Sequence, residues 1–95
     1  MLLHVVCFKY KSETDAAART QHRERLAALK GLDGVIDLKV GEDVVQSARS
    51  YDTGLLITFA DRAALDVYAQ HPQHVPVAQF GVSLSAHIVS VDFQI

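Results

Sequence analysis

The chain has 95 residues, 49% of them hydrophobic and 21% charged, and nine basic against eleven acidic side chains leave a net charge of −2. Neither sign forms a long run, so the sequence lacks the basic surface that nucleic-acid binding or polybasic membrane attachment requires. No apolar run reaches the roughly 20 residues that span a bilayer. We therefore expect one domain over residues 1–95 that binds neither nucleic acid nor a membrane.

The single cysteine, Cys7, cannot form an internal disulfide, which suits a reducing compartment. The first residues lack the charged region and the longer apolar core of a secretory signal. These features predict a cytoplasmic protein. The high hydrophobic content of so small a chain also indicates that some apolar surface is buried against a partner.

The first half of the chain predicts a strand, a helix and a second strand. Residues 2–10 are rich in β-forming residues and apolar on both faces, which predicts a central strand covered on both sides. Residues 15–30 consist mainly of good helix formers, and Gly31 ends this predicted helix. In the region 35–45, apolar and polar residues alternate, which predicts a strand with one wet face near an edge of the sheet.

The second half repeats this pattern in the order strand, helix and strand. Residues 54–59 form an apolar strand, and Asp61 is a suitable N-cap for the helix that carries Tyr68. Pro72 ends that helix near His71, because the residue before a proline disfavours the α conformation.

The segment that follows predicts a short connection and a final strand. Residues 75–80 are expected to form a short helical turn, from which Gly81 releases the chain. Residues 86–93 alternate in the manner of a strand.

The order β-α-β-β-α-β predicts an α+β fold, a ferredoxin-like sandwich with an antiparallel four-stranded sheet. Two helices can cover only one face of such a sheet. We therefore expect a second copy of the chain to cover the other face, which gives a homodimeric α/β barrel. The interior between the two sheets is the predicted place for a small apolar ligand.

The segment from Tyr68 to His74 holds most of the candidate chemistry, with one phenol and two imidazoles at the end of a helix. His74 is the main candidate, because a neutral imidazole with a pKa near 6.5 accepts a proton at about neutral pH. Tyr68 is the second candidate. The alternative for His74 is a structural histidine, and the alternative for Tyr68 is a core tyrosine whose hydroxyl has one partner. Pro72 separates His71 from His74, so we assign His71 to the helix end and keep Tyr68 and His74 as one pair.

His4 lies far away in sequence, on the same strand face as two apolar residues, and is the third candidate. His71 and His74 lack a third ligand nearby, so we expect no metal, and no motif indicates a cofactor. We expect the pocket to be lined by apolar strand residues, namely Val6, Phe8, Leu38, Leu55 and Ile88.

Four segments together resemble the stress-responsive dimeric A/B barrel (Dabb) domain family. They are residues 4–9, 51–59, 68–74 and 89–93, in the order and at the spacing of the family. The resemblance implies a ferredoxin-like protomer and a homodimer. It also implies that no reaction is assigned to most members, while one branch contains polyketide cyclases that perform an aldol condensation without a cofactor.

In the cyclase branch, the histidine that matches His74 acts as the base, and the tyrosine that matches Tyr68 helps to bind or polarise the substrate. The histidine that matches His4 lines the pocket. The cyclases carry aromatic residues along the first helix, where this chain has Ala18, His22 and Leu26. This difference argues against a large polyketide substrate. His22 is considered as a further lining residue and is not assigned a role.

Three functional hypotheses follow. The first is a Dabb protein of unassigned activity that binds a small apolar or aromatic ligand. The second is a cofactor-independent cyclase or isomerase with His74 as base, Tyr68 as polariser and His4 as a pocket partner. The third is a structural dimer whose interior is filled by side chains.

Overall fold

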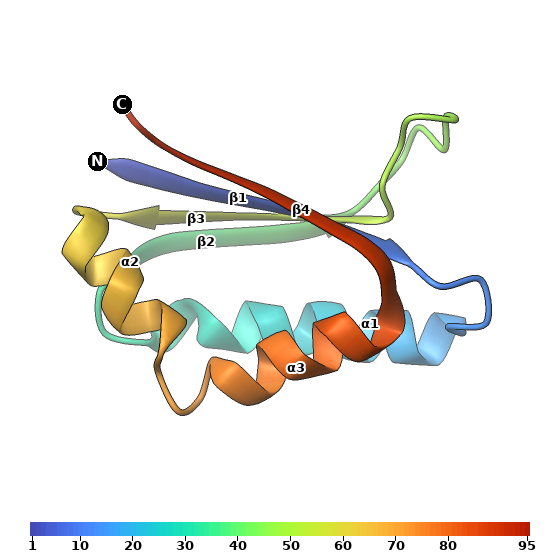
Figure 1. Ribbon diagram of the computed structural model, residues 1–95, viewed down its shortest axis with the longest axis horizontal. Coiled ribbons are helices and arrows are strands. Elements are labelled where there is room, and N and C mark those ends of the chain that lie inside the picture. The colour runs from blue at the N-terminus through green and yellow to red at the C-terminus, as the bar shows by residue number, and fades with distance from the viewer.

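Four strands and their connecting helices follow the predicted order in the computed structural model, which describes residues 1–95. The strands form one antiparallel sheet in the order β2-β3-β1-β4, and the helices lie on one side of it (Figure 1). This arrangement confirms the predicted ferredoxin-like α+β fold. The elements are β1 (Leu2–Tyr10), α1 (Ala16–Ala27), the 3₁₀ helix η1 (Ala28–Gly31), β2 (Val35–Glu42), β3 (Thr53–Phe59), α2 (Arg62–Ala69), α3 (Val75–Leu84) and β4 (Ser85–Gln94).

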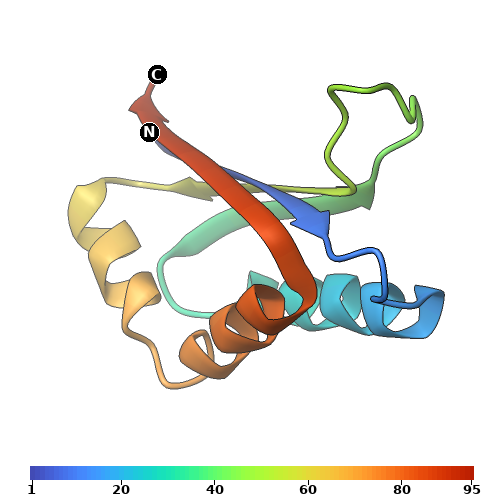
Figure 2. The ribbon, with the colours of Figure 1, turned by 45° about the vertical axis from the view of Figure 1, so that its right-hand side comes forward.

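The first strand is central in the sheet, as its two apolar faces predicted. β1 pairs with β3 on one side and with β4 on the other, so His4 lies opposite Ile57 in one pair and opposite Asp92 in the other. β2 pairs only with β3 and forms an edge, in agreement with its alternating sequence. The β2–β3 loop projects from the sheet on the side away from the helices (Figure 2).

The helix α1 begins at a side-chain cap and buries one narrow face. The carboxylate of Asp15 accepts a hydrogen bond from the backbone N–H of Ala18 at 2.8 Å, which satisfies one free donor of the first turn. His22 and Leu26 are the buried residues of α1. The helix ends at Ala27, earlier than predicted, because the chain tightens into the 3₁₀ turn η1 before it enters β2.

The segment after Pro72 differs from its prediction. It forms the ten-residue helix α3 instead of a short turn, and Gly81 lies inside this helix instead of ending it. Gly81 is needed for close packing: a Cβ atom at this position would lie 2.8 Å from Nε2 of His22 on α1. Glycine therefore lets α3 approach α1, although it weakens a helix interior by about 1 kcal/mol relative to alanine.

We expect Gly81→Ala to destabilise the protein by about 1–3 kcal/mol, because the new methyl group overlaps an imidazole ring that is held by its other nitrogen. Urea unfolding of the two proteins measures this difference. Gly31→Ala is the matched control, because a Cβ atom there meets nothing within 4 Å. A Gly81→Ala protein that is as stable as the wild type would contradict the packing described here.

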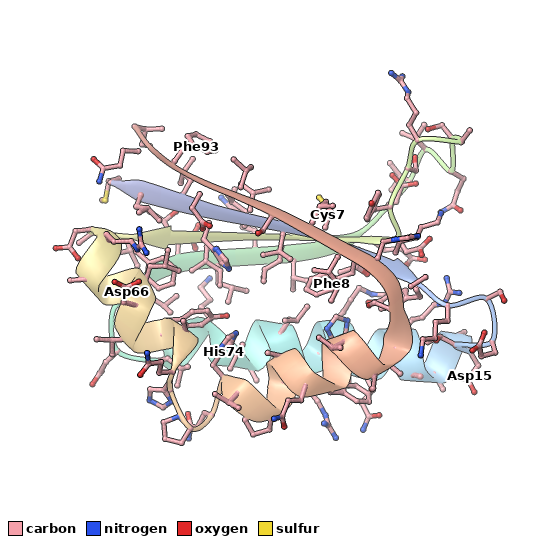
Figure 3. The ribbon with its side chains drawn as sticks, in the orientation of Figure 1. Cys7, Phe8, Asp15, Asp66, His74 and Phe93 are labelled. Atoms are coloured by element: carbon pink, nitrogen blue, oxygen red, sulfur yellow. The ribbon has the colours of Figure 1, made fainter.

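The hydrophobic core lies between the helices and one face of the sheet. Burial of each large side chain in such a core contributes roughly 1.5–3 kcal/mol. Phe8 lies on the helix side of the sheet, whereas Cys7 and Phe93 lie on the opposite side (Figure 3). The core consists of Leu2, Val6, Phe8, Tyr10, Leu26, Leu29, Leu38, Leu55, Ile57, Phe59 and Tyr68.

The opposite face of the sheet is apolar and is covered by no part of the chain. On β4, Val91 is 55% exposed and Phe93 is 43% exposed. Their neighbours in β1, Val5 and Leu3, lie directly opposite them and continue the apolar surface. No helix has the length and apolar character needed to cross a membrane.

Candidate functional site

A cavity of about 260 Å³ lies between the sheet and the helices within one chain. Its walls come from β1, β3 and β4 on the sheet side and from α1, α2 and α3 on the other. Most of the lining is apolar, with polar groups at a few positions. The lining residues are His4, Val6, Phe8, His22, Leu26, Leu55, Tyr68, His74, Val77, Ala78, Val82, Ile88 and Ser90.

The structure corrects the predicted location of these residues. They were expected to face a second sheet across a dimer, but the face of β1 that carries His4 and Phe8 points toward the helices of its own chain. Cys7 and Phe93 occupy the face that is left open (Figure 3). Both faces of β1 are apolar, so the sequence pattern alone does not distinguish the helix-covered face from the open one.

Four of the five predicted lining residues border this cavity. Val6, Phe8, Leu55 and Ile88 lie in its wall, but Leu38 does not. Leu38 is buried in the core on the edge strand β2, which is separated from β1 by β3. The sheet side of the cavity is formed by β1, β3 and β4, and β2 contributes no residue to its wall.

The hydroxyl of Tyr68 is buried in the cavity region without a hydrogen-bond partner. Tyr68 lies in the last turn of α2, its side chain is 2% exposed, and its Oη contacts no donor or acceptor. Leaving a buried hydroxyl unpaired costs about 1–3 kcal/mol. Burial raises the pKa of Tyr68 to about 12, so the group remains a protonated donor at neutral pH.

His74 immediately precedes α3 and lies against the ring of Tyr68, with ring centroids 4.3 Å apart and ring planes inclined by 37°. Its Nδ1 is 3.0 Å from the carbonyl oxygen of Ala69. A carbonyl only accepts, so Nδ1 carries the proton and Nε2 of the neutral ring keeps a lone pair. Burial lowers the pKa of His74 below its usual value, which favours this neutral form.

His4 lies near Tyr68 from the sheet side. The two ring centroids are 6.1 Å apart with the rings edge to face. Nδ1 of His4 donates a hydrogen bond to the carboxylate of Asp92, its direct neighbour on β4. This bond holds the imidazole in one orientation. Nε2 of His4 takes no part in the contact with Asp92. The structure therefore brings together all three predicted candidates, His4, Tyr68 and His74, at one end of the cavity.

His71 lies outside this group. Its Nδ1 accepts a hydrogen bond from the backbone N–H of Gln73 at 3.0 Å, so it stabilises the turn between α2 and α3. This position agrees with its predicted place at the helix end. The structure contains no group of three His, Cys, Asp or Glu side chains that is arranged to hold a metal ion.

His22 is the residue whose importance the sequence did not indicate. It is completely buried and lines the cavity from α1, and its Nδ1 lies 2.7 Å from the hydroxyl oxygen of Tyr10. Its Nε2 has no partner. The available signal was a histidine in line with Leu26 on the buried face of a helix, but such residues are usually satisfied core groups.

The family described as Stress responsive A/B Barrel Domain (Dabb) matches residues 2–95. The chain belongs to the Dabb family. No curated protein matches it.

Solved structures show the same fold as this Dabb chain. A dimeric ferredoxin-like protein of unknown function from Thermobifida fusca YX has a TM-score of 0.90 at 19% identity, over 99% of this chain and 90% of that one. A dimeric ferredoxin-like protein of unknown function from Jannaschia sp. CCS1 has a TM-score of 0.82 at 30% identity, over 99% and 98%. The hydroxynitrile lyase of Passiflora edulis has a TM-score of 0.89 at 19% identity, over 99% and 92%.

Proposed function

We propose that this Dabb protein binds a small, mostly apolar molecule that carries a carbonyl oxygen. The observation that carries the proposal is the buried, unpartnered hydroxyl of Tyr68 beside a mostly apolar cavity. A ligand carbonyl would accept the hydrogen bond that the protein leaves unmade, while the apolar wall would hold the rest of the molecule. The purely structural alternative gives no reason for this hydroxyl, because phenylalanine would fill the same space.

Tyr68→Phe should therefore have two opposite effects. The free energy of unfolding should rise by about 1 kcal/mol, because an unpaired buried hydroxyl is removed. Binding of 4-phenylbutan-2-one, a small aryl ketone, should weaken roughly tenfold, because the hydrogen bond to its carbonyl is lost. Thermal unfolding and isothermal titration calorimetry measure the two effects.

Tyr51→Phe is the matched control, because Tyr51 lies outside the cavity lining and should change neither quantity. Unchanged ketone affinity in Tyr68→Phe would contradict the proposed role of the hydroxyl.

A second candidate function is cofactor-independent proton transfer, favoured by the fixed tautomer of His74. Nε2 of His74 would take a proton from the carbon next to the ligand carbonyl. The electron pair of that C–H bond would move toward the carbonyl oxygen to form an enolate, which the hydroxyl of Tyr68 would stabilise. The imidazolium of His74 would then return the proton to the product. One neighbour of this fold, the Passiflora edulis protein, is a lyase.

The uncovered sheet face supports a homodimer of this Dabb protein. A second copy of the sheet would bury the apolar surface around Val91 and Phe93, and the Thermobifida fusca and Jannaschia neighbours are dimeric proteins. In such a dimer each chain would keep its own cavity on the far side of its sheet.

Val91→Asp should shift the protein to monomers at micromolar concentration, because it would bury a carboxylate in the apolar contact. Analytical ultracentrifugation measures the mass. Val67→Asp provides the control, since Val67 is an exposed valine on α2, away from the sheet face, and should leave the mass unchanged. An unchanged mass in Val91→Asp would place the interface elsewhere.

A further inference from the structure

Most of the residues that line the cavity are buried or half-buried, but three of them are exposed. Val82 on α3 is 63% exposed and Ile88 on β4 is 39% exposed. Ser90, also on β4, is the third exposed lining residue. A residue that both lines a cavity and meets solvent lies at the opening of that cavity. The cavity therefore opens to water between α3 and β4.

The direct connection of α3 to β4 gives this opening a fixed corner. Leu84 ends the helix and Ser85 begins the strand. The carbonyl oxygen of Leu84 accepts hydrogen bonds from the backbone N–H of Lys11 at 2.9 Å and from the hydroxyl of Thr14 at 2.8 Å. The two elements diverge from this corner (Figure 1, Figure 2). Because β4 is an edge strand, no further strand lies beyond it to cover the opening.

Val82 and Ile88 lie at the same level of the cavity. Ile88 is the direct partner of Phe8 in the pairing of β1 with β4. Gly81, the residue before Val82, lies beside the same ring, because a Cβ atom at Gly81 would be 3.5 Å from Phe8. Both rim side chains are apolar, so a ligand that passes between them removes apolar surface from water.

The position of the opening determines which end of a ligand reaches solvent. In the proposed function the ligand carbonyl is bound near Tyr68, which lies beside His4. His4 pairs with Asp92, and Ile88 lies four residues before Asp92 on the same strand, which corresponds to about 13 Å. A ligand whose carbonyl lies at Tyr68 therefore extends its other end along β4 toward the rim formed by Val82 and Ile88.

We infer that Val82 and Ile88 form the entrance of the ligand cavity and select elongated ligands, whose carbonyl end lies inside and whose other end stays in water. The inference rests on the proposed function and extends it to a ligand class. This class is an apolar chain with a carbonyl at its inner end and a polar or charged group at its outer end. Medium-chain oxo acids have this chemistry.

Two chain probes that differ only at the outer end test this inference by isothermal titration calorimetry at neutral pH. They are undecan-2-one and 10-oxoundecanoic acid. The wild type should bind the acid within roughly threefold of the affinity for undecan-2-one, because the carboxylate stays hydrated at the opening. A closed cavity would instead weaken binding of the acid by more than roughly a hundredfold, since an unpaired charge would be buried.

A charge placed on the rim should act on the acid alone. Val82→Lys should tighten binding of the acid roughly threefold at low ionic strength, and added salt should remove this gain. Binding of undecan-2-one should stay unchanged. Val67→Lys is the matched control and should change neither affinity, because Val67 is also 63% exposed but lies on α2 outside the cavity lining.

The outcomes separate the inference from the proposed function. Binding of undecan-2-one with exclusion of the acid, or binding of 4-phenylbutan-2-one with neither chain probe, would overturn the inference and leave the cavity as the proposed site. An equal response of Val82→Lys and Val67→Lys to the acid would place the opening elsewhere and also overturn the inference. Failure of all three probes to bind would overturn the proposed function and the inference with it.

Discussion

Replacing His74 with glutamine should slow proton exchange at the carbon beside a ligand ketone by a factor of about 10²–10⁴, the usual contribution of a positioned general base. Glutamine keeps a polar group at this position but its amide does not accept a proton at neutral pH. Deuterium incorporation into 4-phenylbutan-2-one in D₂O, followed by NMR, measures the rate. The effect is large because the imidazole of His74 packs against the ring of Tyr68 and its Nε2 keeps a lone pair.

The pH dependence of the same exchange provides a second test. Burial lowers the pKa of His74, so its Nε2 should stay unprotonated as the pH falls through 6.5 and lose its lone pair only at lower pH. The exchange rate should therefore persist below pH 6.5 and fall in more acidic solution. His71→Gln is the control, because His71 lies in the turn outside the cavity and should leave the rate unchanged. A His74→Gln protein that retains the wild-type rate would exclude His74 as the base.

The stability of the protein should fall by about 3 kcal/mol between pH 6.5 and pH 4, mainly because of His22. In the folded state, burial and the charge of Arg23 lower the pKa of His22 from 6.5 to about 4. In this pH range the unfolded chain binds a proton at His22 that the folded chain does not, so acid favours unfolding. The shift corresponds to about 3 kcal/mol at 1.36 kcal/mol per pKa unit. The lowered pKa of His74 acts in the same direction.

Urea unfolding at a series of pH values measures this effect. His22→Leu should remove most of the slope of the unfolding free energy between pH 4 and 6.5, whatever its effect on the stability at pH 7. His87→Gln should keep the wild-type slope, because His87 is exposed on β4. If His22→Leu and the wild type show the same slope, the buried imidazole described here does not account for the acid sensitivity.

Much of the fold followed from local patterns. The two apolar faces of residues 2–10 predicted a central strand, and the alternation after residue 35 predicted an edge strand, both as observed. The segment from Tyr68 to His74, with one phenol and two imidazoles, also indicated part of the cavity wall. The structure places His4 beside Tyr68. These features depend on residue types and spacing within single elements, which a sequence displays directly.

Other features depend on contacts between distant elements, which a sequence does not display. Gly81 resembled a chain terminator, but its close contact with His22 of α1 allows α3 to continue past it. The helices cover only one face of β1, and the sequence does not show which one, because both faces are apolar. The cavity was for this reason predicted between two sheets. The partner of His22 lies on β1, twelve residues earlier, and a helical pattern cannot show it.

The central claim is that each chain has its own ligand cavity between its sheet and its helices. The stoichiometry of 4-phenylbutan-2-one binding to the intact protein in solution tests it most directly, measured by calorimetry together with the mass of the assembly. We predict one ligand per chain, with the Tyr68 hydroxyl resonance shifted in the complex. One ligand per dimer, with the Tyr68 resonance unchanged, would place the ligand between the two sheets and contradict the account.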